Sequence, residues 1–429
     1  MPIRILITGT TGESMPPPYA GIPKVSLLYS RVWQQWGNQV GVTFVYRPAH
    51  ADDLGAGAQY FFEYGGKPDK FKKLLFLARY FFIDPVLYFR LLKSYLEIYP
   101  HFTPEVILYS AYGIFLDKVI FSFRPDVILS EATLIKSFMA AQIAKRRKIP
   151  IVFSTYAEVR DLTIGANRYL TDEQRKKYWL AFLDLAELVI GINNCSDGAL
   201  TYLPKDKVKV FYDTCDFSLC RIKIGESRQQ LRDHLKLPSD SFLVGMVGAF
   251  DWRKGQDHLI KAIGKIVRAG HSNIEAAICG GSGDPTKWQE LVRQEGVSDK
   301  IHFFSRLSEM DLTKLYRSLD LYCNLSNTPR SCGLDLALLE AMATGLPIIV
   351  YDNGGLPEAI PERQNGIMVA TNDIDAVAQA ILRIYQLPSA ERQSMGAKSS
   401  AIAAKSDINS TAEIKLNWLK EVIANYNKS

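Results

Sequence analysis

The sequence predicts an α/β protein with two doubly wound domains, each built on a parallel sheet. The chain has 429 residues, which is too long for one hydrophobic core and suits two domains of about 200 residues each. Short apolar runs alternate with helical patterns in both halves of the chain. Most of these runs are apolar at consecutive positions, which is typical of strands covered by helices on both faces.

The expected strands are the apolar runs of each half. In the first half they are 3–8, 40–46, 127–130, 151–154 and 188–192. In the second half they are 242–248, 274–279, 301–304, 321–325, 348–351 and 367–369. Helical patterns lie between them, for example at 252–269 and 334–344.

The boundary between the two domains is expected where apolar density falls, between Lys205 and Ser241. We divide the chain into a first domain of residues 1–205 and a second of residues 206–410. Residues 411–426 then predict one more amphipathic helix. Its expected apolar face is formed by Ile414, Trp418, Val422 and Ile423.

The overall charge and the cysteines exclude several classes of protein. A net charge of +6 with a pI near 8.8 suits an anionic partner, such as a nucleoside diphosphate or an acidic membrane surface, and does not by itself indicate nucleic acid. The cysteines form no C-x-x-C pair, so a zinc site or a disulfide framework is not expected. Cys279 and Cys323 fall in apolar runs and are expected to be buried.

Residues 67–99 interrupt the alternation of strands and helices. They combine many aromatic residues with basic ones, namely Lys67, Lys70, Lys72, Lys73, Arg79, Arg90 and Lys93. One interpretation is a helical pair that touches a membrane surface or a lipid-linked acceptor. The other is a core-packing insertion whose basic side chains reach out to water.

The most informative motif spans residues 331–350, and it predicts a loop, a helix that starts near Gly333, and a strand entered through Gly345 and Pro347. A glycine before a helix lets backbone N–H groups approach a ligand, and the helix N-terminus favours negative charge, so a diphosphate could dock there. Glu340 lies about two turns in, where its carboxylate could accept hydrogen bonds from ribose hydroxyls. The alternative for Glu340 is an exposed helix charge.

A second motif spans residues 248–255, after one expected strand and before a helix. Arg253 and Lys254 place two positive charges at a helix start, where they oppose the helix dipole. A phosphate-bearing ligand would explain them, because Arg and Lys are suited to phosphate. The alternative is two solvated basic side chains.

Together these motifs resemble the donor-binding half of the GT4 family, the retaining glycosyltransferases of GT-B fold. Residues 352–358 and 365–369 resemble further motifs of the same family, and the order and spacing match over about residues 242–370. The resemblance implies two Rossmann-like domains facing across a cleft and a retaining, metal-independent transferase of hexosyl type. Its donor would be a nucleoside-diphosphate sugar, UDP- or GDP-linked, and its acceptor a hydroxyl of a glycan or a lipid-linked glycoconjugate, as in polysaccharide biosynthesis.

The resemblance also implies roles for individual residues. Arg253, Lys254 and Glu340 are the expected catalytic residues, with the two cations clamping the diphosphate. The expected donor-binding residues are Gly21, Gly248, Gly281, Arg306, Leu307, Cys332, Gly333, Leu334 and Glu340. On the acceptor side, Tyr156 and Glu158 stand where many members of the family have a histidine.

The chain departs from the family pattern at Cys332, which replaces the first glutamate of a Glu-x7-Glu motif. Cysteine forms only weak hydrogen bonds and does not replace a carboxylate acceptor. Two alternatives to transfer therefore stay open: a non-catalytic or low-activity partner protein that binds nucleotide sugars, and another GT-B enzyme such as an epimerase. In the family the C-terminal helix crosses back to the first domain, and we expect the same of residues 411–426.

No cofactor, metal or nucleic acid is expected. The Asp-x-Asp sequence at 373–375 precedes a helical pattern and indicates a helix cap rather than a metal site. The chain shows no signal peptide and no run of 18 uncharged apolar residues. We therefore expect the protein in the cytoplasm, at the inner membrane face if residues 67–99 touch a membrane.

Overall fold

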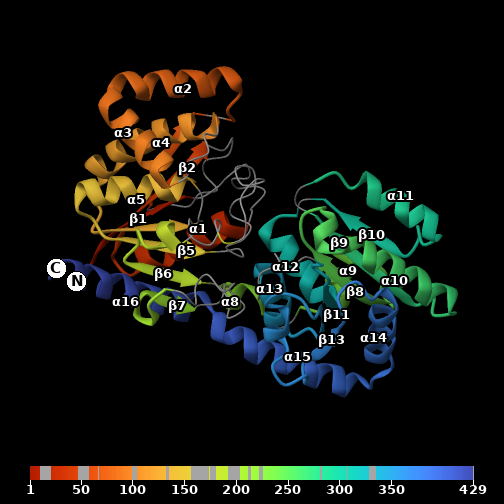
Figure 1. Ribbon diagram of the computed structural model, residues 1–429. Coiled ribbons are helices and arrows are strands. Elements are labelled where there is room, and N and C mark those ends of the chain that lie inside the picture. The colour runs from red at the N-terminus through yellow and green to blue at the C-terminus, as the bar shows by residue number, and fades with distance from the viewer. Residues whose placement is uncertain are drawn as a thin grey trace. The chain divides into compact units, whose positions relative to one another are not determined.

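The chain folds into two compact units in the computed structural model shown in Figure 1. One unit comprises Met1–Phe211 together with Thr411–Ser429, and the other comprises Tyr212–Ser410. The structure describes residues 1–9, 21–46, 58–65, 67–98, 104–131, 135–155, 173, 180–191, 203–210, 214–221, 226–280, 283–305, 307–327 and 335–428.

The described strands of the first unit form one parallel sheet in the order β3-β2-β1-β4-β5-β6-β7. They are β1 (Arg4–Thr8), β2 (Gln39–Tyr46), β3 (Gln59–Tyr64), β4 (Val127–Glu131), β5 (Ile151–Thr155), β6 (Leu188–Gly191) and β7 (Val208–Val210). In the register, Leu6 lies beside Gly41 on one side and Ile128 on the other. Leu6 packs into the core beneath the helices, while Ile5 and Ile7 are equally buried on the opposite face of the sheet.

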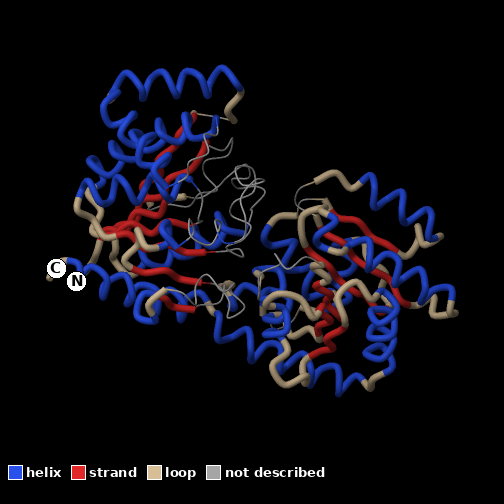
Figure 2. The backbone as a smooth tube through the Cα atoms, in the orientation of Figure 1, coloured by secondary structure: helices blue, strands red, loops and turns tan. Residues whose placement is uncertain are grey.

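The helices of the first unit lie on both sides of its strands, as Figure 2 shows. They are α1 (Gly21–Gln35), α2 (Lys70–Ile83), α3 (Pro85–Ile98), α4 (Pro104–Phe123), α5 (Ile135–Arg147) and the C-terminal α16 (Ile408–Tyr426), with a short 3₁₀ turn, η3 (Lys205–Lys207). Within α4, the window Val106–Phe123 is long and apolar enough to span a membrane by length and composition, but 67% of it is buried in the unit. It is the core helix against which α2, α3 and α5 pack.

The second unit holds a parallel sheet of the described strands in the order β10-β9-β8-β11-β12-β13. The strands are β8 (Phe242–Val247), β9 (Ile274–Cys279), β10 (Ile301–Phe304), β11 (Leu321–Asn324), β12 (Ile348–Tyr351) and β13 (Gly366–Val369). The helices are α8 (Phe217–Cys220), α9 (Arg228–Leu235), α10 (Gln256–Arg268), α11 (Thr286–Glu295), α12 (Glu309–Ser318), α13 (Leu336–Ala343), α14 (Ile374–Gln386) and α15 (Ser389–Ala403), with 3₁₀ turns η4 (Trp252–Lys254), η5 (Leu356–Ala359) and η6 (Ala404–Ser406).

The predicted architecture is confirmed, and every expected strand is present to within a residue at each end. Two strands, β3 and β7, were not predicted. Both form the edges of the first sheet and are only partly buried, so their sequences lack the continuous apolar run that marks the inner strands. Because β7 pairs with β6, the first unit extends to Phe211, and the boundary expected at residues 205 and 206 is too early.

The helix expected over 252–269 is divided at Gly255. The 3₁₀ turn η4 ends there and α10 begins at Gln256, with Gly255 in the left-handed region at φ 77°. A Cβ on Gly255 would lie 2.2 Å from the carbonyl oxygen of Leu325. The tight turn and the close approach to the chain after β11 both require glycine at this position.

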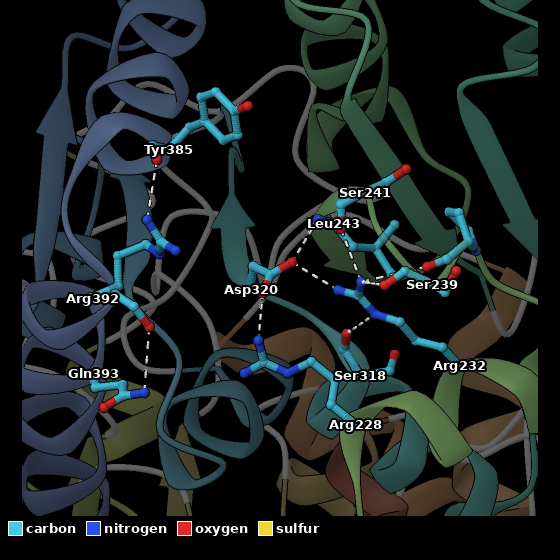
Figure 3. Close-up of polar contacts among 12 residues, drawn as sticks. Arg228, Arg232, Ser239, Ser241, Leu243, Ser318, Asp320, Tyr385, Arg392 and Gln393 are labelled. Carbon is cyan, nitrogen blue, oxygen red and sulfur yellow. Dashed lines mark hydrogen bonds and ion pairs between the residues drawn. The ribbon is translucent and has the colours of Figure 1, made fainter.

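A charged cluster around Asp320, with Arg232 buried and Arg228 half exposed, stabilises the second unit (Figure 3). Arg232 of α9 donates to Asp320 at 2.7 Å and to the carbonyl oxygens of Ser318, Ser239 and Ser241. The other oxygen of Asp320 accepts from Arg228, and the Leu243 N–H donates to Asp320 at 2.8 Å. Asp320 and Leu243 lie at the amino ends of β11 and β8, the edge of a parallel sheet where ligands do not usually bind, so we assign this cluster to stability.

The C-terminal helix α16 is held in the first unit by two buried polar contacts. The Trp33 indole N–H donates to the Ala412 carbonyl at 2.9 Å, and the Lys415 ammonium lies 3.3 Å from Oε1 of Glu131 at the end of β4. The buried face of α16 contains Ala412, Lys415, Leu416 and Leu419, whereas Ile414 is exposed. Of the expected apolar face, Ile414 is exposed, whereas Trp418, Val422 and Ile423 are partly buried. The prediction missed the most buried side of the helix because that side includes a lysine, Lys415, which pairs with Glu131.

Candidate functional site

The loops after β8 and β11 meet at the point where the chain reverses its direction of winding across the second sheet. From β8 the chain proceeds to β9 and β10 on one side, and β11 then pairs with β8 on the other side. In open parallel sheets, ligands bind outside the carboxyl ends of the strands at such a switch point. The two strongest sequence motifs, 248–255 and 331–350, lie in the segments that leave β8 and β11 at this edge.

The loop after β8 is shaped by its own side chains. Asp251 caps the turn η4 by accepting from the Arg253 N–H at 3.0 Å, and the Arg253 guanidinium folds back onto the same carboxylate. The hydrogen bond from Arg253 holds the pKa of Asp251 below its ordinary value. Gln256, which is fully buried, donates to the Ala249 carbonyl at 2.7 Å. Arg253 thus already has one carboxylate partner, so binding an anion would require it to share or leave Asp251.

Lys254 reaches across to the helix that follows β11. Its ammonium lies 3.7 Å from Oδ2 of Asp335, and both side chains are partly exposed. Asp335 is the N-cap of α13, since its Oδ1 accepts from the Leu338 N–H at 2.9 Å. The helix therefore begins at Leu336 and not near Gly333, and its N-terminus already carries a carboxylate.

Asparagine side chains connect the same two loops. The Asn327 amide donates to the Trp252 carbonyl at 3.0 Å, and the Asn327 N–H donates to the Arg253 carbonyl at 2.9 Å. Asn324, at the end of β11, donates to Oδ2 of Asp335 at 3.2 Å. These contacts fix the turn bearing Lys254 against the start of α13, so the cation and the helix N-terminus are held in one place.

Glu340 is buried on α13, which excludes the alternative of an exposed helix charge. The pKa of Tyr316 is raised well above its ordinary value. Burial is the main cause, and the Glu340 carboxylate is the next. Tyr322 is also buried and has a raised pKa, with the Asp335 carboxylate as the next cause and Glu340 contributing. Glu340 therefore lies within electrostatic reach of both tyrosines, and Asp335 within reach of Tyr322.

The structure places the other expected residues as follows. Gly248 ends β8 at the site, and its N–H donates to the Cys279 carbonyl at 3.0 Å. Leu307 is partly buried against the second core. Gly21 is the first residue of α1 in the first unit. Gly281, Arg306, Cys332, Gly333, Leu334, Tyr156 and Glu158 lie outside the described residues.

Three site residues were missed from the sequence. Asp335 and Asp251 each had a detectable signal, since an aspartate directly before a helical run is a common N-cap. Trp252, whose side chain is 65% exposed beside Arg253, had none, because a single tryptophan in a loop is usually buried.

Metal-binding residues do not gather in the part of the chain that the structure describes. No group of three or more His, Cys, Asp or Glu residues there could hold a metal ion. Asp373 of the Asp-x-Asp sequence is the N-cap of α14 and accepts from the Ala376 N–H at 2.9 Å, as expected. Cys279 and Cys323 are buried, and burial raises the pKa of the Cys279 thiol to about 12.

Comparison with protein families finds one that covers this site. Residues 227–401 match the family described as glycosyl transferases group 1. A relative from Methanocaldococcus jannaschii, described as an uncharacterized glycosyltransferase, is 32% identical over 183 residues, which are 42% of this chain and 45% of the relative. The match thus spans less than half of that relative's own length.

Solved structures resemble the chain along nearly its whole length. Sucrose-phosphate synthase from Thermosynechococcus elongatus superposes with a TM-score of 0.74 at 16% identity, covering 99% of this chain and 100% of that one. The Anabaena protein HepE, solved in complex with UDP-glucose, gives a TM-score of 0.69 at 17% identity, covering 97% of this chain and 100% of that one. At this level of identity the likeness shows the fold, which both units share with these proteins.

Proposed function

We propose that the chain transfers a sugar from a nucleoside-diphosphate sugar to a hydroxyl acceptor, because residues 227–401 match the glycosyl transferases group 1 family and the whole chain shares the two-domain GT-B fold of solved glycosyltransferases. The observation that carries the proposal is the joining of Lys254 to the start of α13 at the switch point between β8 and β11. A cation beside a helix N-terminus, reached by the loops of two adjacent parallel strands, suits a diphosphate.

The proposed donor is a UDP- or GDP-linked sugar. Support comes from the Anabaena neighbour, whose structure is described as a complex with UDP-glucose. Glu340 is buried just over one turn into α13, and its carboxylate is proposed to accept hydrogen bonds from the ribose hydroxyls. The acceptor is proposed to be a hydroxyl of a glycan or of a lipid-linked glycoconjugate, met by the first unit.

The proposed chemistry proceeds with retention at the anomeric carbon and without a metal ion. The bond between that carbon and the diphosphate oxygen breaks, an oxocarbenium-like centre forms, and the acceptor oxygen bonds to it on the same face. The acceptor proton passes to the departing phosphate, so charge and atoms balance. Lys254 and Arg253 stabilise the leaving diphosphate, and a preorganised group of this kind contributes about 3 kcal/mol.

The position of Asp335 favours the second candidate function, which is a protein that binds nucleotide sugars with little or no turnover. Its carboxylate stands at the N-cap of α13 and is paired with Lys254, so a diphosphate must displace a negative charge to reach both. Such a competitor lowers affinity or turnover without changing the fold. Binding and turnover must therefore be measured separately.

The test is a panel of UDP- and GDP-sugars, with the free nucleotides as controls. We expect at least one sugar nucleotide to raise the melting temperature of the full chain and then to release its nucleoside diphosphate slowly in the presence of a hydroxyl acceptor. Stabilisation without release would support the binding-only candidate, and formation of an isomerised sugar nucleotide without acceptor would indicate an epimerase. If no sugar nucleotide and no free nucleotide shifts the melting temperature, the assignment of this site is wrong.

A further inference from the structure

Helix α2 carries apolar side chains on two of its faces. On the inner face, Phe76 and Tyr80 are buried against α4, with the rings of Phe76 and Phe115 6.2 Å apart. The outer face is also apolar and is exposed: it bears Phe71, Leu74, Leu75 and Phe82, which recur at the three- and four-residue spacing of one helix face. A surface helix of a globular unit normally has a single apolar stripe, directed at the core. The inner stripe meets that need, so the outer one requires another explanation.

The exposed residues continue from α2 onto the start of α3. We call the docking patch the set Phe71, Leu74, Leu75, Phe82, Ile83, Val86 and Phe89. Phe82 is 80% exposed, Val86 68% and Phe71 66%. Phe81 joins the two helices, with its ring 5.4 Å from that of Phe82 and 5.8 Å from that of Phe89. Figure 1 shows α2 at the outer edge of the first unit.

Basic side chains border the docking patch. Lys70 and Lys72 fall on opposite sides of the stripe that runs through Phe71, at 100° per residue, and both are exposed. Further exposed cations on the two helices are Lys73, Arg79, Arg90 and Lys93. An apolar stripe between rows of lysine and arginine is the composition of helices that lie in the plane of a membrane interface.

The acidic residues of α2, α3 and their caps each contact a neighbouring group of the same two helices. Asp69 caps α2 by accepting from the Lys72 N–H at 2.7 Å, and Asp84 accepts from the Leu87 N–H of α3 at 2.8 Å. Glu97 lies 3.8 Å from the Lys93 ammonium. Lys72 also lies 3.9 Å from Asp69. Residues 69–98 carry six basic side chains against these three acidic ones, so the net charge around the patch is positive.

We propose that the docking patch binds the surface of an anionic lipid bilayer, with its phenylalanine and leucine side chains in the boundary between headgroups and acyl chains. A protein partner fits less well, because lysine is depleted in protein interfaces relative to the rest of the surface, whereas here lysines flank the apolar stripe on both sides. The helices α2 and α3 have 14 residues each, which is too short to cross a bilayer. The two interpretations of residues 67–99 thus apply to different faces: the inner face fills the core, and the outer face meets the lipid. The proposal does not depend on glycosyl transfer.

The experiment is vesicle flotation of the full chain, with vesicles of pure phosphatidylcholine or of equal parts phosphatidylcholine and phosphatidylglycerol. Wild type should float with the anionic vesicles, less so in high salt, and weakly with the neutral ones. A variant that combines Lys70→Glu, Lys72→Glu and Lys73→Glu should lower the partition by about a hundredfold or more, since each basic residue at an anionic surface contributes about fivefold. The matched control changes Lys287, Lys398 and Lys428 of other surfaces to Glu, with the same loss of net charge, and should float like wild type.

The apolar part is tested by combining Phe82→Ser with Phe89→Ser. Because both side chains are exposed, the melting temperature should stay near that of wild type while the partition falls at least about tenfold. Phe82→Leu with Phe89→Leu keeps the apolar surface and should retain binding.

Failure of wild type to float would overturn the proposal, and so would equal losses in the patch and control lysine variants. A wild-type dimer in light scattering that the serine variant converts to monomer, without vesicle binding, would assign the patch to a second copy of the chain and equally overturn it.

Discussion

The ammonium group of Lys254 lies 3.7 Å from the carboxylate of Asp335, and this pair joins the loop after β8 to the first turn of α13. A basic residue and an N-cap aspartate from adjacent strands thus neutralise one another at the proposed diphosphate site. The pairing gives the site a defined ligand-free state. Replacing Lys254 and replacing Asp335 should therefore change diphosphate binding in opposite directions.

Replacing Lys254 should weaken nucleoside diphosphate binding. Lys254→Ala removes a charged hydrogen bond to phosphate and should cost about 1.5–3 kcal/mol, measured by titration calorimetry. Lys398→Ala, an exposed lysine of α15, is the matched control and should bind as wild type does. Unchanged affinity of the Lys254 variant would remove this residue from the site.

Replacing Asp335 should have the opposite effect. Asp335→Asn keeps an N-cap that accepts from the Leu338 N–H but removes the negative charge that competes for Lys254. We expect several-fold tighter binding of the diphosphate with nearly unchanged stability. Asp335→Ala should lower the free energy of unfolding by about 1 kcal/mol through loss of the cap. Weaker binding in the asparagine variant would show that Asp335 contacts the donor favourably.

Donor turnover should not require a divalent metal. The described residues offer no cluster of three metal-binding side chains, and the proposed leaving group is stabilised by cations of the chain itself. The rate of nucleoside diphosphate release should be the same in EDTA and in added manganese. A rate lost in EDTA and restored by manganese would contradict this prediction.

Stability of the second unit should fall on acidification through the titration of His258. Burial lowers the pKa of His258 below its ordinary value of 6.5, and its Nδ1 lies 2.8 Å from the Tyr351 hydroxyl. The unfolded chain therefore binds a proton more readily than the folded one, so this contribution is full above about pH 6.5 and is lost as the pH falls below it. Melting temperatures between about pH 8 and 5 should decline less steeply in His258→Asn. Parallel curves for the two proteins would refute the assignment.

The contact between Lys415 and Glu131 should be essential to the first unit. Lys415→Met leaves Glu131 as an uncompensated buried charge and should lower the free energy of unfolding by about 3–5 kcal/mol. Adding Glu131→Gln removes that charge and should recover much of the loss. Urea denaturation followed by tryptophan fluorescence measures both, with the exposed Lys428→Met as control. Equal losses in the single and double variants would mean that α16 is held mainly by its apolar contacts.

The sequence predicted the inner strands of both sheets and the edge strands β10 and β13 of the second sheet because their apolar runs are continuous. It failed at β3 and β7, the half-exposed edges of the first sheet, whose sequences are interrupted by polar residues. It located α16 but not its buried face, since Lys415 reads as a solvent-facing residue until its partner Glu131 is known. That partner lies 284 positions away in the chain, beyond any local pattern.

At the site, residue types were easier to predict than their pairing. Lys254 and Glu340 follow from motifs, and both lie on the segments that leave the switch point. The salt bridge with Asp335 could not be predicted, because it depends on β8 and β11 being neighbours in the sheet, which sequence order does not reveal. The exposed apolar stripe of α2 could not be predicted either, because composition alone does not show which of two apolar faces packs against the core.

The return of the chain to the first unit at Thr411 sets an order for folding during synthesis. The second unit is continuous in sequence, and all of its residues have been made once Ser410 has been added. The first unit begins to be made earlier but lacks α16, and with it the partners of Trp33 and Glu131, until translation passes Lys415. On the ribosome, the unit whose residues are made first is therefore completed last.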